Sequence, residues 1–297
     1  MAEQSPFLAE KRYAVVTGAN KGIGLEVCRQ LAAQGVVVIL TSRDEKRGLD
    51  NLRKSGLNSD NLEFHQLDVT DPTSVASLAH FIDAKFGKLD ILVNNAGILG
   101  AIADFNALFA AGFPEAESLS ADMVTQTYVQ AQECLQTNYY GVKTATEALL
   151  PLLKLSNSPR IINVSSAAGK LCHIRNDQIR GILANAEELT EERVDSIVDE
   201  FLRDFKDGTF VEKGWIPVLS AYFASKAALN AYTRILAKKH PTIIINCLCP
   251  GFIKTDINNH VGPLPVEQGG ARVVRLALAP HASPSGLFYT NDQVTPF

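Results

Sequence analysis

The chain has 297 residues, a length suited to one α/β domain, and it contains neither a linker rich in proline and serine nor an internal repeat. Its formal net charge of −4 and its isoelectric point of about 5.9 argue against nucleic acid as a partner. The sequence shows no apolar stretch that could span a bilayer, no apolar h-region in its first seven residues, and an odd number of cysteines. We therefore expect a cytoplasmic protein with reduced thiols.

A glycine-rich turn follows the first predicted strand. Residues 13–17 form a short apolar run, and an amphipathic helix pattern begins at the glycines Gly18, Gly22 and Gly24. Such glycines permit a tight turn and let backbone N–H groups approach a pyrophosphate at the positive end of the helix. The spacing is looser than the usual dinucleotide fingerprint, and a plain turn is the alternative. The flanking strand and helix favour dinucleotide binding.

The second predicted strand, residues 36–42, ends at Ser42 and Arg43, where the adenosine ribose is recognised in dinucleotide-binding folds. An acid at this position favours a 2′-hydroxyl, whereas an arginine pairs with a 2′-phosphate. The sequence therefore favours NADP over NAD. Asp44 is the counter-argument, although it lies one residue beyond the expected acidic position and has Lys46 and Arg47 as possible partners.

Further strands alternate with helices along the chain. Asp68 ends a third strand, where it either holds the adenine amine or caps the next helix. A fourth strand ends at Asn94, and its carboxyl end should lie over the cofactor. Two more apolar strands, residues 160–164 and 243–249, precede Ser165 and Pro250 respectively. This alternation predicts a single α/β domain, a Rossmann-like doubly wound parallel sheet.

Tyr222 and Lys226 are four residues apart in a predicted helix, so their side chains share one face. A neighbouring ammonium lowers the pKa of a phenol and makes it a proton donor or acceptor near neutral pH. That chemistry suits a carbonyl or an alcohol. Taken alone, the pair is equally compatible with a solvated helix face.

Several motifs, in this order, resemble those of the short-chain dehydrogenase/reductase family over nearly the whole chain. They are Thr17-Gly-x-x-x-Gly-x-Gly24, Asn94-Asn-Ala-Gly97, Asn138, Ser166, Tyr222-x-x-x-Lys226 and Pro250-Gly251. The stretches Gly18-Ala-Asn-Lys-Gly-Ile-Gly24, Phe64-His-Gln-Leu-Asp-Val-Thr-Asp71 and Ala227-Ala-Leu-Asn-Ala-Tyr-Thr-Arg234 resemble the monomeric carbonyl-reductase branch, and its plant members in specialised metabolism above all.

The resemblance implies a role for each catalytic residue. Tyr222 donates the proton, and Ser166, rather than its neighbour Ser165, hydrogen-bonds the substrate oxygen. Lys226 lowers the pKa of Tyr222 and binds the nicotinamide ribose, while Asn138 holds a water that links Lys226 to solvent. The implied NADP(H)-binding residues are Gly18, Asn20, Lys21, Gly22, Ile23, Gly24, Arg43, Arg47, Asp68, Val69, Asn94, Tyr222, Lys226, Pro250, Gly251, Ile253 and Thr255.

Two long segments depart from the simplest members of the family. Between Ser166 and Tyr222 the chain has a helix pattern that opens at Thr190 and bears an apolar stripe. In the carbonyl-reductase branch such an insert covers the dimer surface, which implies a monomer. The segment 99–135 is also long, and we expect it to close over the substrate. The predicted helical inserts are thus about 99–135 and 167–219; their apolar residues include Phe105, Leu108, Phe109, Phe113, Val194, Ile197, Val198, Phe201, Leu202 and Phe205.

The resemblance implies an NADPH-dependent reductase that transfers hydride to the carbonyl of an apolar cyclic ketone, either monoterpenoid, such as menthone, or alkaloid-like. The alternative is an ene-reductase acting on a conjugated C=C, but a family member with that activity has glutamate in place of Tyr222. A non-catalytic NADP-binding sensor is the third hypothesis. No metal is expected, because Cys247 and Cys249 alternate on a buried strand. Trp215, His173 and His260 either line the substrate pocket or pack in the interior.

Overall fold

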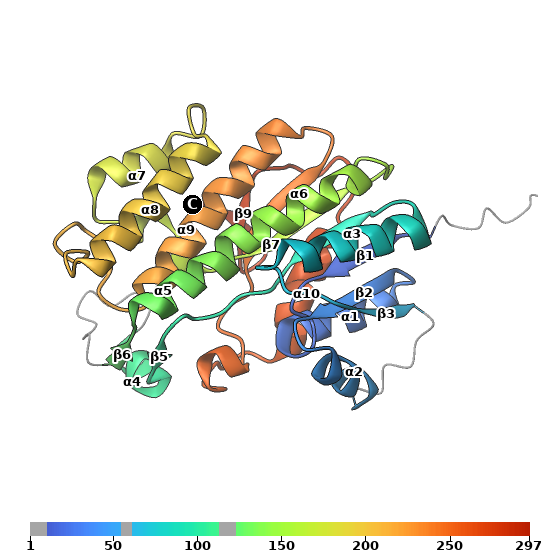
Figure 1. The fold of residues 1–297 in the computed structure, drawn as a ribbon, viewed down its shortest axis with the longest axis horizontal. Coiled ribbons are helices and arrows are strands. Elements are labelled where there is room, and N and C mark those ends of the chain that lie inside the picture. Colours follow the sequence, from blue (N-terminus) through green and yellow to red (C-terminus); the bar gives the residue numbers. More distant parts are fainter. Residues whose placement is uncertain (1–10, 55–60, 113–122) are drawn as a thin grey trace, which may run out of the picture.

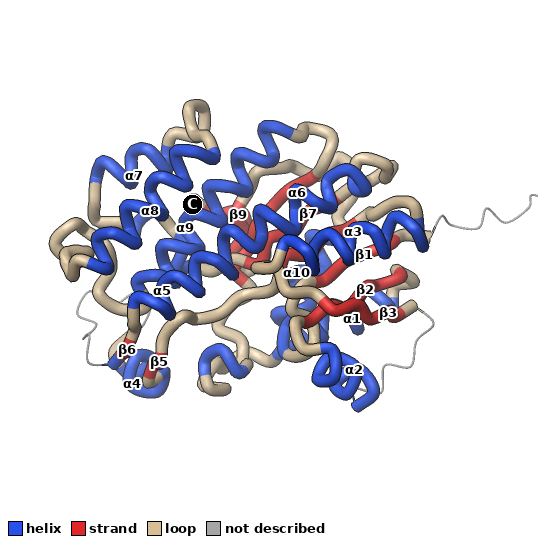
Figure 2. Tube along the Cα trace, in the orientation of Figure 1, coloured by secondary structure: helices blue, strands red, loops and turns tan. Residues whose placement is uncertain are grey.

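In the computed structural model, which describes residues 11–54, 61–112 and 123–297, one mainly parallel sheet forms the centre of the molecule (Figures 1 and 2). Its eight strands lie in the order β10-β9-β8-β7-β4-β1-β2-β3. The strands are β1 (Tyr13–Val16), β2 (Val37–Ser42), β3 (Leu62–Gln66), β4 (Ile91–Asn94), β7 (Arg160–Val164), β8 (Ile244–Cys249), β9 (Phe288–Thr290) and β10 (Gln293–Thr295).

The strand order reverses beside β1. The chain builds β2 and β3 on one side of β1, then returns to place β4 on the other side. In open parallel sheets, ligands bind outside the carboxyl ends of the strands at such a reversal. The predicted doubly wound fold is confirmed, and the reversal places the glycine-rich turn after β1 next to the residues that follow β4.

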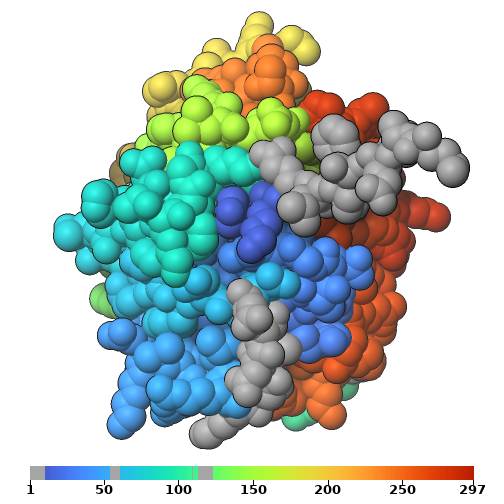
Figure 3. Space-filling model, turned by 90° about the vertical axis from the view of Figure 1, so that its right-hand side faces the viewer, coloured from blue at the N-terminus to red at the C-terminus, as the bar shows by residue number. Residues whose placement is uncertain are grey.

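Helices cover both faces of the sheet. One face carries α1 (Gly22–Ala33) and α10 (Val266–Ala277), which contact each other, and α2 (Glu45–Lys54) lies beside β2 and β3. The other face carries α3 (Pro72–Phe86), α5 (Tyr128–Leu135), α6 (Gly141–Leu153) and α9 (Ser220–Lys239). Viewed from the side of α3, blue and cyan N-terminal residues cover most of the surface, and yellow residues appear only at its upper end (Figure 3).

Two apolar cores fill the space between the sheet and its helices. Alternation along the strands divides each strand between them, because successive side chains point to opposite faces. On β1, for example, Val15 belongs to the core beneath α3, α6 and α9, whereas Ala14 and Val16 belong to the core beneath α1 and α10. Strands β2, β4, β7 and β8 are buried at every residue and therefore read as mostly apolar runs in the sequence.

The insert between Ser166 and Tyr222 forms two helices, α7 (Asp177–Ala184) and α8 (Glu191–Lys206). Thr190 caps α8 through its side chain, which accepts a hydrogen bond from the Arg193 backbone N–H. The apolar stripe of α8 packs on α9 and α5, which lie beneath it in Figure 1. Of the predicted stripe, Val194, Ile197, Val198 and Phe201 are buried, and Leu202 and Phe205 pack at the edge of the same core.

Residues 99–112 and 123–125 contain two short strands and a short helix. These are β5 (Ile102–Ala103), β6 (Val124–Thr125) and α4 (Phe105–Ala110), with β5 antiparallel to β6. Phe105 and Leu108 are buried in a cluster that includes Val218, Leu219 and Phe223. Phe113 and the side chain of Phe109, which were also expected here, fall outside the described part of the chain.

The C-terminal edge of the sheet differs from the all-parallel prediction. β9 and β10 pair antiparallel through a two-residue turn at Asn291 and Asp292, both with positive φ, 49° and 68°. Asparagine and aspartate tolerate this backbone region, which two-residue hairpin turns require.

Among the helices of the described residues, none combines the length and the apolar composition needed to cross a membrane.

Candidate active site

The glycine-rich turn packs closely against the residues that follow β4. Gly18 has a φ of 61°, and a Cβ on it would lie 2.8 Å from the Ala96 Cα. A Cβ on Gly24 would lie 2.5 Å from the Asn95 Nδ2. Any larger residue would push the turn away from the end of β4, so both glycines are needed for the close approach. The turn leads directly into the N-terminus of α1, a position where backbone N–H groups can bind an anion.

Thr17 and Asn95 hold this turn in place. The Thr17 Oγ1 accepts hydrogen bonds from the backbone N–H groups of Asn95 (3.0 Å) and Ala96 (2.9 Å). In return, the Asn95 Nδ2 donates to the carbonyls of Thr17 (2.9 Å) and Gly18 (3.0 Å). These four bonds fasten the ends of β1 and β4 together. Sequence reasoning gave neither side chain this role, although both lie inside the motifs.

Asn94, predicted to contact the cofactor, has its side chain in the interior. It is 2% exposed, and its Nδ2 donates to the Asn163 Oδ1 (2.8 Å) and the Thr146 Oγ1 (3.1 Å). The side chain therefore ties β4 to β7 and α6. Only the backbone of Asn94 lies at the predicted edge of the sheet.

Lys21 and Thr255 join the glycine-rich turn to the segment after β8. The Lys21 Nζ lies 2.5 Å from the Asp256 Oδ2, in a half-exposed ion pair. The methyl group of Thr255 would lie 3.4 Å from a Cβ on Gly22. Asp256 also pairs with the His260 Nε2 at 3.0 Å. The hydrogen bond from Lys21 is the largest cause that holds the pKa of Asp256 below its usual value.

The same segment contains the other predicted residues after β8. Gly251 has a φ of 99°, and the Pro250 carbonyl accepts a hydrogen bond from the Arg272 Nη1 at 2.7 Å. Ile253 is buried and forms an isolated bridge with Leu264. This half of the predicted cofactor set thus lies opposite the glycine-rich turn.

At the other end of the turn, Arg43 and Arg47 are exposed beside the end of β2. Asp44 does not compete for the ribose position. Its Oδ1 accepts a hydrogen bond from the Arg47 backbone N–H at 2.8 Å, and its carbonyl accepts one from Ser42. Asp44 therefore caps α2, which weakens the argument for NAD. The Asn20 carbonyl accepts a hydrogen bond from the Asn51 Nδ2, which links the turn to α2.

Asp68 follows β3 and forms a local turn. Its Oδ1 accepts hydrogen bonds from the backbone N–H and the hydroxyl of Thr70. The residue that caps α3 is Asp71, which accepts from the Thr73 N–H at 2.9 Å. The capping alternative for Asp68 is thus wrong. Val69 is buried, and it lies against Gly141 at the start of α6.

Tyr222 and Ser166 meet at the carboxyl end of β7. Tyr222 is in the first turn of α9 and half-buried, and a hydrogen bond joins its phenol to the Ser166 hydroxyl. Ser166 also caps a short 3-10 turn by accepting from the Ala168 N–H at 3.1 Å. Apolar side chains of the segments near 103, 218 and 252 surround the ring. The site is therefore a polar pair within an apolar wall.

Ser165 turns away from this pair. It is 3% exposed, and its Oγ donates to the Asn230 Oδ1 at 2.6 Å. The Asn230 Nδ2 in turn donates to the Gly169 carbonyl at 3.0 Å. A Cβ on Gly169 would lie 2.6 Å from the Lys226 carbonyl oxygen, so glycine permits this loop to approach α9. Asn230 thereby fixes the loop that presents Ser166.

Lys226 is buried, with 5% of its surface exposed. Its Nζ donates to the Val164 carbonyl at 3.0 Å and lies 5.6 Å from the centre of the Tyr222 ring. Desolvation lowers the pKa of Lys226 from 10.5 to about 8. Protonation of this buried amine therefore costs free energy of folding, so its position does not serve stability.

The structure reverses the predicted direction of the Tyr222 pKa. Burial raises the pKa of the phenol above its ordinary value, and the hydrogen bond from Ser166 opposes that rise without cancelling it. The prediction from the sequence considered the charge of Lys226 and left out the burial of both side chains. Both groups are instead desolvated, which disfavours the phenolate and the ammonium alike.

Asn138 lies in a π-helical turn, η2 (Gln136–Tyr140), between α5 and α6. It is fully buried; its Oδ1 accepts from the Ile98 N–H (2.8 Å), and its Nδ2 donates to the Ile98 carbonyl (2.9 Å) and the Ser225 Oγ (3.0 Å). A Cβ on Gly97 would lie 3.3 Å from the Asn138 Oδ1 and 3.7 Å from the Lys226 Nζ. Asn138, Lys226 and the loop after β4 therefore converge.

Comparison with known proteins agrees with this geometry. The model of the short chain dehydrogenase family matches residues 12–176 and 212–263, more than half of the chain. The chain belongs to the short-chain dehydrogenase family. The part between the two matched segments contains α7 and α8, the insert that departs from the family pattern.

Individual short-chain dehydrogenases match over the whole length. The chain is 65% identical to short-chain dehydrogenase/reductase 1 of Saponaria officinalis and 54% identical to (+)-neomenthol dehydrogenase of Arabidopsis thaliana, with 100% of each chain covered. The solved structure of salutaridine reductase from Papaver somniferum superposes with a TM-score of 0.87 at 47% identity, covering 94% of this chain and 99% of that one. The predicted family and enzyme class are confirmed: the protein is an oxidoreductase of a family that binds nicotinamide cofactors.

The start of α9 shows a feature that sequence reasoning missed. Leu219, directly before this helix, is buried and has a φ of 51°, a region that residues other than glycine seldom adopt. Gln126 spans the gap to the 99–125 segment, because its Nε2 donates to the Gly100 carbonyl at 2.6 Å and its Oε1 accepts from the Ala221 N–H at 3.4 Å. The position of Tyr222 thus depends on both variable segments.

The three side chains left open by the sequence are placed as follows. Trp215 is buried under α8, where its Nε1 donates to the Asp204 Oδ2 at 3.1 Å, so it is a packing residue. His260 is exposed and paired with Asp256. His173 packs edge-on against Phe223 at 5.1 Å between ring centres, next to the Tyr222 turn. His173 is therefore the one of the three that adjoins the apolar wall of the site.

Cys247 and Cys249 form a small apolar cluster with Phe288, and all five cysteines of the chain are free thiols.

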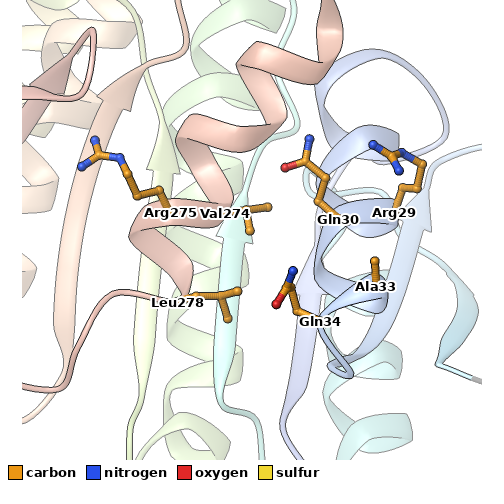
Figure 4. Close-up of a pocket in the computed structure, with 7 residues that line it drawn as sticks. All are labelled: Arg29, Gln30, Ala33, Gln34, Val274, Arg275 and Leu278. Atoms are coloured by element: carbon orange, nitrogen blue, oxygen red, sulfur yellow. The ribbon is translucent and has the colours of Figure 1, made fainter.

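A surface hollow of about 250 Å³ lies beside the C-terminal half of α1, at the end away from the glycine-rich turn (Figure 4). It separates the C-terminal half of α1 from α10, and its lining residues are Arg29, Gln30, Ala33, Gln34, Val274, Arg275 and Leu278. None of the predicted site residues lines it.

Proposed function

We propose that the protein is an NADPH-dependent reductase that converts an apolar cyclic ketone to an alcohol, with Tyr222 as the proton donor. The observation that carries this proposal is the hydrogen-bonded pair of Tyr222 and Ser166 within an apolar wall. The similarity to proteins named neomenthol dehydrogenase and salutaridine reductase supports a monoterpenoid or alkaloid-like ketone.

The chemistry of the pair fits reduction. Hydride supplied by the bound nicotinamide makes the carbonyl oxygen negative, and hydrogen-bond donors aimed at that oxygen lower the barrier by about 3–4 kcal/mol for one donor. Ser166 and Tyr222 are two such donors. Because burial raises the pKa of the Tyr222 phenol, it stays protonated at neutral pH and is ready to give its proton to the alkoxide.

Lys226 and Asn138 support the proton donor. Lys226, with a pKa of about 8, exchanges protons near physiological pH, and it lies beside Tyr222 and close to Asn138. We propose that it holds the nicotinamide ribose and that Asn138 anchors a water that returns protons to Lys226. Asn138 also fixes Ile98, and with it the loop after β4.

The residues fit a dinucleotide phosphorylated on the adenosine ribose. The turn that would cradle the pyrophosphate requires glycine, because a Cβ on Gly18 or Gly24 would clash with the residues after β4 and Gly22 has a φ of 57°. Arg43 and Arg47 are exposed at the end of β2, and the nearest carboxylate, Asp44, is occupied as a helix cap. We therefore assign NADP rather than NAD, with the 2′-phosphate bound by these arginines.

The remaining assignments belong to the same proposal. α8 packs on α5 and α9, and we infer that it takes the place of a partner subunit, which makes the protein a monomer. The free thiols favour the reducing environment of the cytoplasm. The segment 99–135, whose described residues 99–112 and 123–135 include Gln126 bound to the start of α9, closes over the ketone in this proposal.

Tyr222→Phe tests the reaction directly. This variant keeps the ring and removes only the donor, so NADPH should bind with nearly unchanged affinity while kcat on cyclic ketones falls by orders of magnitude. Ser165→Ala is the matched control, because its hydroxyl faces Asn230 and should leave kcat within about threefold. A Tyr222→Phe enzyme that still reduces ketones at the wild-type rate would exclude Tyr222 as the donor.

A further inference from the structure

A partly buried polar network connects the insert to the π-helical turn η2. The phenol of Tyr139, which is fully buried, donates to the Asp195 Oδ1 at 2.7 Å. The Lys143 Nζ donates to the Asp195 Oδ2 at 2.8 Å and lies 3.5 Å from the Glu191 carboxylate. Asp195 and Glu191 belong to α8, whereas Tyr139 and Lys143 belong to η2 and α6.

Aromatic packing makes this network rigid. The Tyr139 ring meets the Tyr232 ring edge-on, with 6.2 Å between the ring centres. The Lys143 ammonium lies 5.5 Å from the centre of the Tyr139 ring and 6.0 Å from that of Tyr232. Burial raises the pKa of the Tyr139 phenol, so it remains a donor to Asp195 at any physiological pH. The hydroxyl therefore holds η2 to α8 by a permanent contact.

Tyr139 directly follows Asn138 in η2, and the two side chains bind opposite neighbours. Asn138 holds Ile98 and Ser225 on the side of the active site, while Tyr139 holds Asp195 on the side of the insert. A π-helical turn contains an extra residue, is rare, and occurs often at functional sites. Side chains on both sides of this turn therefore hold it in position.

We propose that Asp195 and Lys143 are positioning residues for carbonyl reduction, which act through Tyr139 to hold Asn138 against Ile98 and Ser225. The insert then does more than cover a surface, because one of its carboxylates sets the geometry of the catalytic centre. This inference rests on the proposed function for its kinetic effects. Its structural half, the bracing of η2 by α8, does not depend on the substrate.

The test compares Tyr139→Phe and Asp195→Ala with Asp204→Asn as a matched control. Asp204 is another carboxylate of α8, more deeply buried than Asp195, and it binds Trp215 and Lys213 at the other end of that helix, away from η2. Each variant is assayed for kcat, for the KM of a cyclic ketone, for NADPH affinity by fluorescence, and for backbone amide exchange of residues 136–141.

The two brace variants should lower kcat about tenfold, with KM and NADPH affinity within about twofold, since a small displacement of a catalytic group affects turnover more than binding. Amide exchange in residues 136–141 should become faster in both. Asp204→Asn should lower the melting temperature without changing kcat or this exchange. Equal losses of kcat in all three variants, or wild-type kcat in both brace variants, would overturn the proposal.

The exchange measurement separates this inference from the proposed function. If the wild-type enzyme reduces no ketone, the proposed function fails, and the exchange of residues 136–141 still decides whether α8 braces η2. Faster exchange in Tyr139→Phe and Asp195→Ala supports the brace, and unchanged exchange in both refutes it. Tyr139→Phe retains the ring and its packing, so it keeps the test available if Asp195→Ala does not fold.

Discussion

Replacing Lys226 by methionine should change how the stability of the protein depends on pH. The pKa of Lys226 is lowered by burial from 10.5 to about 8, so the folded state loses this proton at a lower pH than the unfolded chain. Between these two values the unfolded state binds more protons, and stability therefore rises with pH. Methionine keeps an unbranched side chain of similar length and removes the titrating group.

The size of the effect follows from the shift. At pH 7 a lowering of this extent disfavours the folded state by about 3 kcal/mol, and at pH 9.5 by about 1 kcal/mol. Relative to Lys226→Met, the wild-type protein should thus gain about 2 kcal/mol in its free energy of unfolding between these pH values. The variant also loses the hydrogen bond to the Val164 carbonyl, which changes its free energy of unfolding by nearly the same amount at every pH.

Urea denaturation of both proteins without nucleotide, at pH 7.0, 8.0, 9.0 and 9.5, measures this difference. Other titrating groups are common to the two proteins, so they cancel when the free energies are subtracted. A difference that stays constant over this range would show that Lys226 titrates normally in the folded state. The conclusion that desolvation lowers the pKa of Lys226 would then be wrong.

Three further outcomes follow from the structure. Arg43→Glu should weaken NADPH binding by at least about tenfold more than NADH binding, because the pairing with the 2′-phosphate is replaced by repulsion; equal losses would contradict the NADP assignment. Asp256→Asn should lower the Kd for NADPH by about two- to threefold at low salt and less at high salt, since it releases the Lys21 ammonium; an unchanged Kd would place Lys21 away from the phosphates. The protein should elute as a monomer of 32.2 kDa at micromolar concentration, whereas a stable tetramer by light scattering would refute our interpretation of α8.

The sequence predicts the sheet well because its central parallel strands are buried on both faces. Apolar runs such as Val36–Leu40 are unambiguous, and their order along the chain, with glycine-rich and polar residues at their ends, defines a doubly wound topology. The C-terminal hairpin was missed because its strands have three residues each. Its turn at Asn291 and Asp292 carries the one signal that would have revealed it.

Choices between neighbouring residues depend on contacts that are distant in sequence. Ser165 is separated from the reaction by Asn230, and Asp71 rather than Asp68 caps α3. The local sequence does not distinguish the two serines or the two aspartates, because the same residue type stands at both candidate positions. The pKa of Tyr222 is a similar case, since the spacing to Lys226 predicts proximity but contains no information on how deeply both groups are buried.

The reaction catalysed at Tyr222 is tested most directly by the position of the transferred hydride. A cyclic enone is reduced with NADPH that carries deuterium on the transferred position, and the product is analysed by mass spectrometry and NMR. We predict an allylic alcohol with deuterium on the carbinol carbon, formed by the wild-type enzyme and lost in Tyr222→Phe. A saturated ketone with deuterium on the β-carbon, formed equally by Tyr222→Phe, would contradict carbonyl reduction and identify an ene-reductase.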